Sequence, residues 1–241
     1  LAGLVDSIVG GGGLILLPAL FATFPNAPPA TLFGTNKSAS IWGTAFAAAR
    51  YARRVRVRWP ALLPVAAAGF LGSLGGAWVV PWVDAQALRR LLPIILIGLL
   101  AYTMAHKNLG RHHAPHHRGH HETAWASAIG LGIGFYDGFF GPGTGSLLVF
   151  LFVRVLGYDF LHASVSAKFV NTATNLSALL LFGFQGHVWW HLALAMAAAN
   201  ITGSLIGTHL ALRHGAGFVR GVFIVVVGAL ILRTAYDAYL R

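Results

Sequence analysis

The chain contains no cysteine, so disulfide bonds and thiol chemistry are excluded. Charged residues make up only 10% of its 241 residues, whereas a soluble domain carries roughly 25%. Acidic residues number six, and neither an HExxH pattern nor a nucleophile elbow is present. These absences argue against an enzyme and against a soluble domain.

Long apolar runs are abundant instead. Hydrophobic residues make up 56% of the chain, and its mean hydropathy is +0.69. Residues 59–83 and 169–212 form two runs without a formal charge. A membrane-spanning helix needs about 20 apolar residues, so the second run must hold two spans, divided near residues 184–187. The sequence therefore predicts an all-α polytopic membrane protein embedded in a lipid bilayer.

The net charge is +11, and the basic residues lie mainly between the apolar runs. They form two groups, Arg50, Arg53, Arg54, Arg56 and Arg58, and then Lys107, Arg111 and Arg118. An excess of lysine and arginine is typical of cytoplasmic loops. No aromatic residues alternate with these basic ones, so nucleic acid is not an expected partner. No signal peptide is expected, because no basic region or cleavage site precedes the first apolar stretch.

An internal repeat relates two parts of the chain at one constant offset, the spacing that separates Lys37 from Lys168. The recurring residues are Gly3, Asp6, Gly10, Gly12, Lys37, Trp59, Gly72, Ser73, Leu74 and Gly76, which return as Gly134, Asp137, Gly141, Gly143, Lys168, Trp190, Gly203, Ser204, Leu205 and Gly207. We expect a first membrane repeat at 1–106, a His-rich cytoplasmic linker at 107–122 and a second membrane repeat at 123–241. Each repeat contains four hydrophobic segments, at 1–24, 35–50, 59–83 and 88–106, and at 123–157, 164–183, 187–213 and 216–238.

Glycine interrupts the first segment of both repeats, at residues 10–13 and 141–145. Such runs are poor helix interior, so each segment is predicted to be two half-helices joined by unwound chain. Transporters place their binding sites at paired broken segments of this kind. The alternative is that the glycines only allow close packing of helices.

Loop charges predict that the two repeats are inverted relative to each other. The loop at 50–58 carries five arginines, whereas its counterpart at 184–189 has no formal charge. If both loops faced the cytoplasm, the second would contradict the positive-inside rule. Inversion requires an odd number of crossings per repeat, which a re-entrant first segment would supply.

Lys37 and Lys168 lie within apolar segments, where an ionised side chain is costly and by default indicates a functional site. Polar residues three and seven positions further on share the helix face of each lysine. Half-helix N-termini add free N–H groups that attract anions. The predicted substrate-binding residues are Lys37, Lys168, Thr35, Asn36, Ser40, Thr44, Asn171, Asn175, Gly12, Gly13, Gly143 and Thr144.

The repeated aspartates, Asp6 and Asp137, are predicted to pair with the lysines or to couple ion movement. The alternative is that these ion pairs serve the structure alone.

Histidine is concentrated in the predicted linker, which also offers weak candidates for a metal site. The candidates are His112, His113, His116, His117, His120 and His121. No cysteine or carboxylate completes a recognisable site, so we favour a solvated loop and expect neither a metal nor another cofactor.

Four features of the chain carry a family resemblance: Asp6 to Gly13, Gly34 to Lys37, Lys168 with Asn171 and Asn175, and the two Gly-Ser-Leu-x-Gly stretches. Together they resemble the TauE/SafE sulfite exporter family, also called the 4-toluene sulfonate uptake permease family. The resemblance covers nearly the whole chain outside the linker. It implies a bacterial or archaeal inner-membrane permease for sulfite, sulfonates or other small organic anions, dependent on the ion-motive force. The second repeat departs from the first in having Ala167 where the first has Asn36.

The sequence thus predicts a permease that moves a small oxyanion by alternating access around the paired lysines. Two alternatives stay open. One is an anion channel that uses the same lysines for selectivity. The other is a metal-ion transporter served by the histidine linker. The oligomeric state is left open.

Overall fold

The computed structural model describes residues 1–239 apart from 25, 81–96, 98–100 and 102–119. Every regular element in these ranges is an α-helix, with no strand among the described residues, which confirms the predicted all-α class. The helices are α1 (Ala2–Val9), α2 (Gly12–Thr23), α3 (Pro29–Ala52), α4 (Trp59–Val79), α6 (His120–Phe139), α7 (Thr144–Leu156), α8 (Phe160–Phe184) and α9 (Trp190–Tyr239). Almost all of the predicted segment at 88–106 lies outside the described residues.

Helices end at the glycine runs singled out in the sequence. α1 ends at Gly10, whose φ of 79° lies in the left-handed region, and α2 begins two residues later. Residues 140–143 separate α6 from α7, and Gly143 has a φ of 83°. A further glycine, Gly215 with φ 71°, divides α9 into two parts between the expected segments at 187–213 and 216–238.

Several helices begin earlier than the hydrophobic segments indicate. α3 begins at Pro29 rather than at residue 35, because proline fits the first turn of a helix. α8 begins at Phe160 rather than at 164, because the Asp159 side chain accepts a hydrogen bond from the His162 N–H at 2.8 Å and caps the helix. α6 begins at His120, so the last residues of the expected linker belong to this helix.

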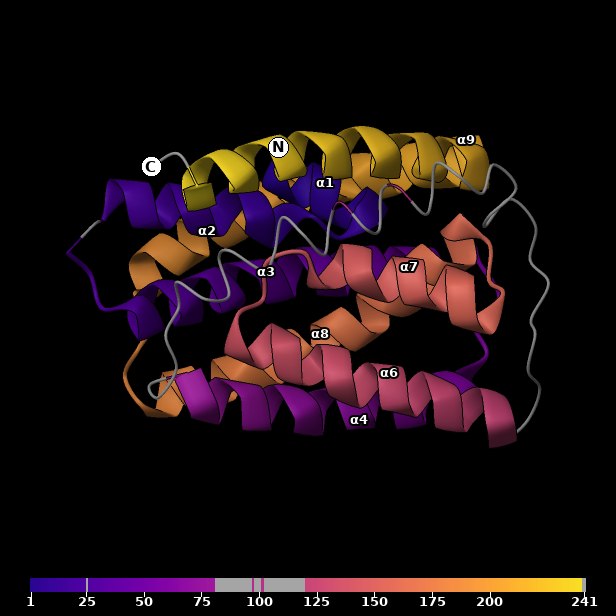
Figure 1. Cartoon of the computed structure of the whole chain (residues 1–241), viewed down its shortest axis with the longest axis horizontal. Coiled ribbons are helices and arrows are strands. Elements are labelled where there is room, and N and C mark those ends of the chain that lie inside the picture. The colour runs from indigo at the N-terminus through magenta and orange to yellow at the C-terminus, as the bar shows by residue number, and fades with distance from the viewer. Residues whose placement is uncertain (25, 81–96, 98–100, 102–119, 240–241) are drawn as a thin grey trace.

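The helices form three layers (Figure 1), with α9, α1 and α2 along one side, α3, α7 and α8 in the middle, and α4 with α6 along the other side. Small residues allow the closest contacts. A Cβ on Gly72 or Gly76 of α4 would overlap the backbone of α6, and a Cβ on Gly3 of α1 would overlap Asn200 of α9. The first segment of each expected repeat therefore packs on the third segment of the other.

Contacts along the helices give their directions. α1 is parallel to the first part of α9, because Gly3 lies against Asn200 and Ser7 lies against Gly207. α3 is parallel to it as well, because Ala39 lies against Asn200 and Gly43 lies against Ser204. α4 is parallel to α6, because Gly69 lies against Gly134 and Ser73 lies against Gly138. α4 is also parallel to α8, because Gly69 lies against Val170 and Ser73 lies against Thr174. The two sets are antiparallel, since Thr31 at the start of α3 contacts His187 just beyond the end of α8.

Both broken segments fold back on themselves. α2 ends close in sequence to the start of α3, so it is antiparallel to α1. α7 ends close in sequence to the start of α8, so it is antiparallel to α6. The α1–α2 and α6–α7 hairpins consequently reach the middle of the bundle from opposite ends (Figure 1). Their glycine turns meet there.

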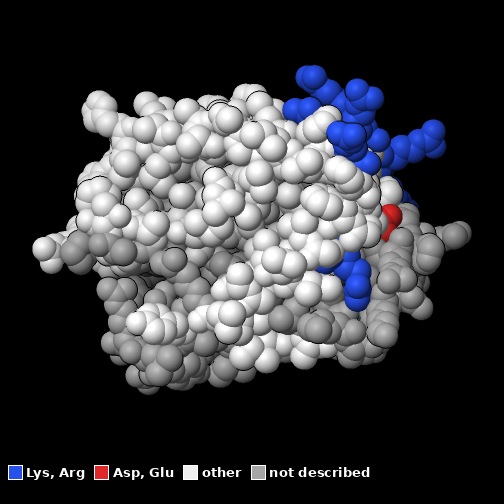
Figure 2. All heavy atoms as spheres, turned by 90° about the horizontal axis from the view of Figure 1, so that it is seen from above, with Lys and Arg blue, Asp and Glu red and all other residues white. Residues whose placement is uncertain are grey.

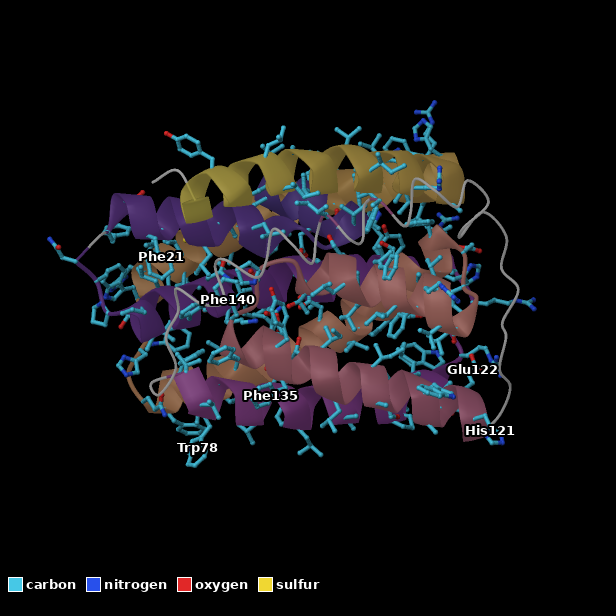
Figure 3. The ribbon with its side chains drawn as sticks, in the orientation of Figure 1. Phe21, Trp78, His121, Glu122, Phe135 and Phe140 are labelled. Atoms are coloured by element: carbon cyan, nitrogen blue, oxygen red, sulfur yellow. The ribbon has the colours of Figure 1, made fainter. Side chains whose placement is uncertain are left out.

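Apolar side chains cover the outside of the bundle. Large exposed ones include Trp42, Leu63, Leu71, Trp78, Leu131, Phe135, Leu194 and Val225, and Figure 3 shows Trp78 on the outer side of α4. Two helical stretches, Trp59–Val79 and Trp190–Val226, are long and apolar enough to cross a membrane. Basic atoms gather at one end of the long axis in Figure 2, as expected of a cytoplasmic end.

Candidate functional site

Lys37 of α3 lies in the interior and forms an ion pair with Asp137 of α6. Its Nζ is 2.7 Å from Asp137 Oδ1, and the side chains are 3% and 2% exposed. The ammonium also lies beside the turn between α6 and α7, since a Cβ added to Gly141 would be 3.2 Å from Nζ. A cation is therefore held at the point where the second broken segment unwinds.

Lys168 of α8 is in the corresponding position and pairs with Asp6 of α1. Its Nζ donates to Asp6 Oδ2 at 3.3 Å, and none of the lysine side chain is exposed. Asp6 has a second partner, because its Oδ1 accepts from the backbone N–H of Gly12 at 3.2 Å. This N–H is one of the free donors at the start of α2, where the helix dipole favours a negative charge.

The two ion pairs cross between the expected repeats. Lys37 and Lys168 occupy equivalent positions of the repeat, and so do Asp6 and Asp137. Each lysine contacts the aspartate of the other half rather than that of its own. Sequence order alone suggested no such exchange, since each aspartate precedes a lysine within its own half.

The two broken segments touch through glycine. A Cβ on Gly10 would overlap the backbone of Gly145, and a Cβ on Gly145 would overlap that of Gly10. Gly10 also has a positive φ of 79°, which other residues rarely adopt. Glycine is required at this crossing by both the space and the backbone conformation.

Hydroxyl groups satisfy the last carbonyls of α1, which have no partner within the helix. Tyr51 donates to Ser7 O and Ser146 to Val9 O, both at 3.0 Å, and Ser164 donates to Ile8 O. These three donors were missed in the sequence. A polar residue within an apolar helix was the available signal, but it does not identify a partner.

Apolar side chains occupy the repeat positions equivalent to those three hydroxyl donors. The repeat equivalents of Ser146, Ser164 and Tyr51 are Ile15, Phe33 and Phe182. Phe33 packs against Phe140, which directly follows α6, with ring centroids 6.5 Å apart, and against Phe21 at 6.0 Å. Figure 3 shows Phe140 in the middle of the bundle. The two halves share their charges but differ in the groups around their breaks.

Some of the expected ligands lie near the pairs as buried polar groups. Asn175 Nδ2 donates to Asn171 Oδ1 at 3.3 Å, one and two turns beyond Lys168 on α8. Asn36, beside Lys37, is buried, and its Oδ1 has no hydrogen-bond partner among the described residues. Asp137 Oδ2 is in the same condition. A buried acceptor without a donor is costly, so these two oxygens require an explanation.

Other expected ligands make local hydrogen bonds. Thr35 donates to Thr31 O at 2.7 Å and accepts from the Trp189 N–H at 3.0 Å, so it fastens α3 to the loop before α9. Thr44 donates to carbonyls of its own helix, and Thr144 donates to Gly141 O at 2.8 Å. Among the remaining positions, Ser40 is half-buried, Gly13 lies near Pro142, and Gly143 forms part of the turn before α7.

Metal binding has little support in the described part of the chain. No group of three or more His, Asp or Glu side chains there is able to hold a metal ion. The candidates His112, His113, His116 and His117 lie outside the described residues, and His120 is described by its backbone alone. His121 is exposed at the start of α6 (Figure 3).

A basic groove lies at the arginine-rich end of the bundle. Its volume is about 890 Å³, and Arg50, Arg53, Arg54, Arg213 and His209 line it together with apolar side chains of α3, α8 and α9. At the same end, Arg58 is fixed by Glu122, with its Nη1 2.6 Å from Oε2. Burial and the hydrogen bond that Tyr158 donates to Glu122 raise the pKa of the Tyr158 hydroxyl.

Apolar outer faces and ion pairs buried beside two broken helical segments are the arrangement expected of a polytopic membrane transporter. The family model for the sulfite exporter TauE/SafE matches residues 1–234, so the chain belongs to this family.

Curated relatives agree with the assignment. A probable membrane transporter protein, ORF9, from a Sinorhizobium species is 34% identical over 98% of this chain and 89% of its own length. The probable membrane transporter protein YfcA of Escherichia coli K12 is 34% identical over 99% of this chain and 87% of its own. A probable membrane transporter protein of Haemophilus influenzae is 30% identical, with 98% and 91% covered. The chain is therefore a membrane transporter and not an enzyme. No solved structure matches it.

Proposed function

We propose that this transporter carries a small oxyanion, sulfite or an organosulfonate, across the bacterial inner membrane, with Lys37 and Lys168 as the cations that bind it. The observation that carries this proposal is the crossed arrangement of the two buried lysine–aspartate pairs. An oxyanion offers a lysine the same charge and acceptor oxygens as a carboxylate does. Exchange of aspartate for substrate keeps each buried ammonium paired throughout transport.

In this proposal, the transport movement depends on two inverted repeats of four segments each, and residues 88–106 are the fourth segment of the first repeat. Supporting this, equivalent positions make equivalent contacts: α1 packs on α9 as α6 packs on α4. The α1–α2 and α6–α7 hairpins enter from opposite ends (Figure 1). Rocking of one half against the other opens the lysines first to one side and then to the other, as in other transporters with inverted repeats.

Neutral donors complete the anion site. The amides of Asn36, Asn171 and Asn175 are close in sequence to the two lysines and buried, and each carries two N–H donors. The basic groove at the arginine-rich end raises the local concentration of anions at the cytoplasmic opening. The hydroxyls of Thr35, Thr44 and Thr144 already donate to backbone carbonyls, so they contribute to positioning rather than to binding.

The decisive experiment separates binding from structural pairing. Wild type and the double variant Lys37→Met/Asp137→Leu are reconstituted in proteoliposomes and tested with sulfite, sulfate and a simple alkyl sulfonate. The double variant removes both charges of one pair, so that neither partner is left buried alone. We expect saturable sulfite or sulfonate transport in wild type and loss of it in a folded double variant. Unchanged transport in the double variant would contradict the proposal, and ohmic currents in wild type would indicate a channel.

A further inference from the structure

The two ion pairs differ in what remains when the lysine is taken away. Asp6 keeps its bond to the Gly12 N–H, lies at the N-terminus of α2 and is 14% exposed. Asp137 has its Oδ1 on Lys37, while its Oδ2 has no hydrogen-bond partner among the described residues, and its side chain is 2% exposed. The chain thus holds one aspartate with a second source of stabilisation and, within its described part, one without.

This difference has a consequence if an anion occupies the lysines, so the inference rests on the proposed function. Once substrate replaces Asp6 on Lys168, the Asp6 carboxylate still has the Gly12 N–H as a donor and the positive end of the α2 dipole beside it. Once substrate replaces Asp137 on Lys37, the carboxylate would remain in a side chain that is 2% exposed, without a hydrogen-bond donor among the described residues. An isolated buried charge of this kind neutralises instead of persisting.

We infer that Asp137 is a proton-binding site that couples one proton to each transported anion. The anion takes the place of the Asp137 carboxylate on the Lys37 ammonium, and the carboxylate gains a proton from water on the open side, which forms an O–H bond on one of its oxygens. After the bundle opens to the other side, the anion leaves and the proton returns to water there. The ion pair then reforms, and for a monoanion this exchange moves no net charge.

Few other titratable groups surround Asp137 in the described part of the chain. α2 and α4 contain none. α7 contains only Arg154, two residues from its end. In the first half of α3, the only such group is Lys37 itself. On α8, Lys168 is paired with Asp6, and His162 lies at the far end with Asp159. Tyr136, the preceding residue of α6, donates its hydroxyl to Pro142 O at 2.6 Å. Lys37 is therefore the charge that Asp137 balances.

The test measures anion binding against pH in purified protein. The probe is an alkyl sulfonate, which stays a monoanion over the whole range, so that any pH dependence belongs to the protein. If one proton binds with each anion, the wild-type Kd rises about tenfold for each pH unit above the point where the free carboxyl ionises. Asp137→Asn resembles the protonated carboxyl, so its Kd is expected to be low and independent of pH. The matched variant Asp6→Asn is expected to keep the wild-type slope.

Proton counting gives a second measurement that needs no variant. A pH-sensitive dye in weakly buffered solution is expected to record one proton taken up per sulfonate bound by wild type.

A pH-independent wild-type Kd, no proton uptake, or a slope that disappears in Asp6→Asn but persists in Asp137→Asn would overturn the coupling role while leaving the anion site intact. Absence of sulfite and sulfonate binding at every pH would overturn the proposed function itself. Asp137→Glu, which retains a carboxyl, is expected to retain the slope and serves as the folding control.

Discussion

Removal of Lys37 is expected to destabilise the protein more than removal of Lys168, although the two lysines are equivalent in the repeat. At 2.7 Å and an effective dielectric constant near 20, the attraction between Lys37 and Asp137 is about 6 kcal/mol before desolvation is subtracted. Lys37→Met leaves Asp137 buried and unpaired, for which the expected loss of unfolding free energy is about 3–5 kcal/mol. Lys168→Met leaves Asp6 with its Gly12 N–H, so the expected loss is smaller, about 1–3 kcal/mol.

The double variant Lys37→Met/Asp137→Leu tests the same reasoning from the other direction. With both charges replaced by apolar side chains, no buried charge lacks a partner, and most of the stability lost in Lys37→Met is expected to return. Unfolding of each variant in mixed detergent micelles, followed by circular dichroism, supplies the free energies for a double-mutant cycle. The reasoning is refuted if Lys37→Met costs no more than Lys168→Met, or if the double variant is as unstable as Lys37→Met alone.

Two further predictions concern helix contacts. Gly76→Ala is expected to cost several-fold more stability than Gly75→Ala. A Cβ at Gly76 would overlap the Phe135 backbone, whereas a Cβ at Gly75 would be 3.8 Å from the Phe135 ring. Equal thermal stability of the two variants would contradict the described α4–α6 packing. Ser164→Ala removes the donor to Ile8 O, so a loss of about 1–3 kcal/mol is expected in the same unfolding assay, and a neutral result would show that this carbonyl has another donor.

Much of the helix pattern was predictable because local rules govern it. Apolar runs gave the helices, and the runs at Gly10 and Gly141 marked the interruptions, since other residues rarely adopt the positive φ found there. The spacing after Lys168 put Asn171 and Asn175 on one face, and these two side chains do bond to each other. Their role as substrate ligands stays a prediction.

The pairing between halves was not predictable from one sequence. The constant offset of the repeat shows which positions correspond, but it does not show whether Lys37 meets Asp6 or Asp137. That choice depends on helix packing, which brings Asp137 of α6 to Lys37 of α3 and Asp6 of α1 to Lys168 of α8. The partners of Thr35 were not predictable either. Its hydroxyl donates to Thr31 O and accepts from the Trp189 N–H, and its role as a substrate ligand stays a prediction.

The divergence of the two halves bears on how a duplicated transporter acquires direction. If the halves were identical, the two open states would have equal energy, and each lysine–aspartate pair would respond in the same way to an anion. Under the proposed function, the charges that both halves share allow substrate to replace an aspartate at each lysine. The differences lie around them: hydroxyls cap the end of α1, aromatic rings surround Phe140, and the Gly12 N–H binds Asp6 but has no counterpart on Asp137 among the described residues. Under the proposed mechanism these unequal surroundings give the two pairs different responses, so one half can carry the proton while the other keeps its charge.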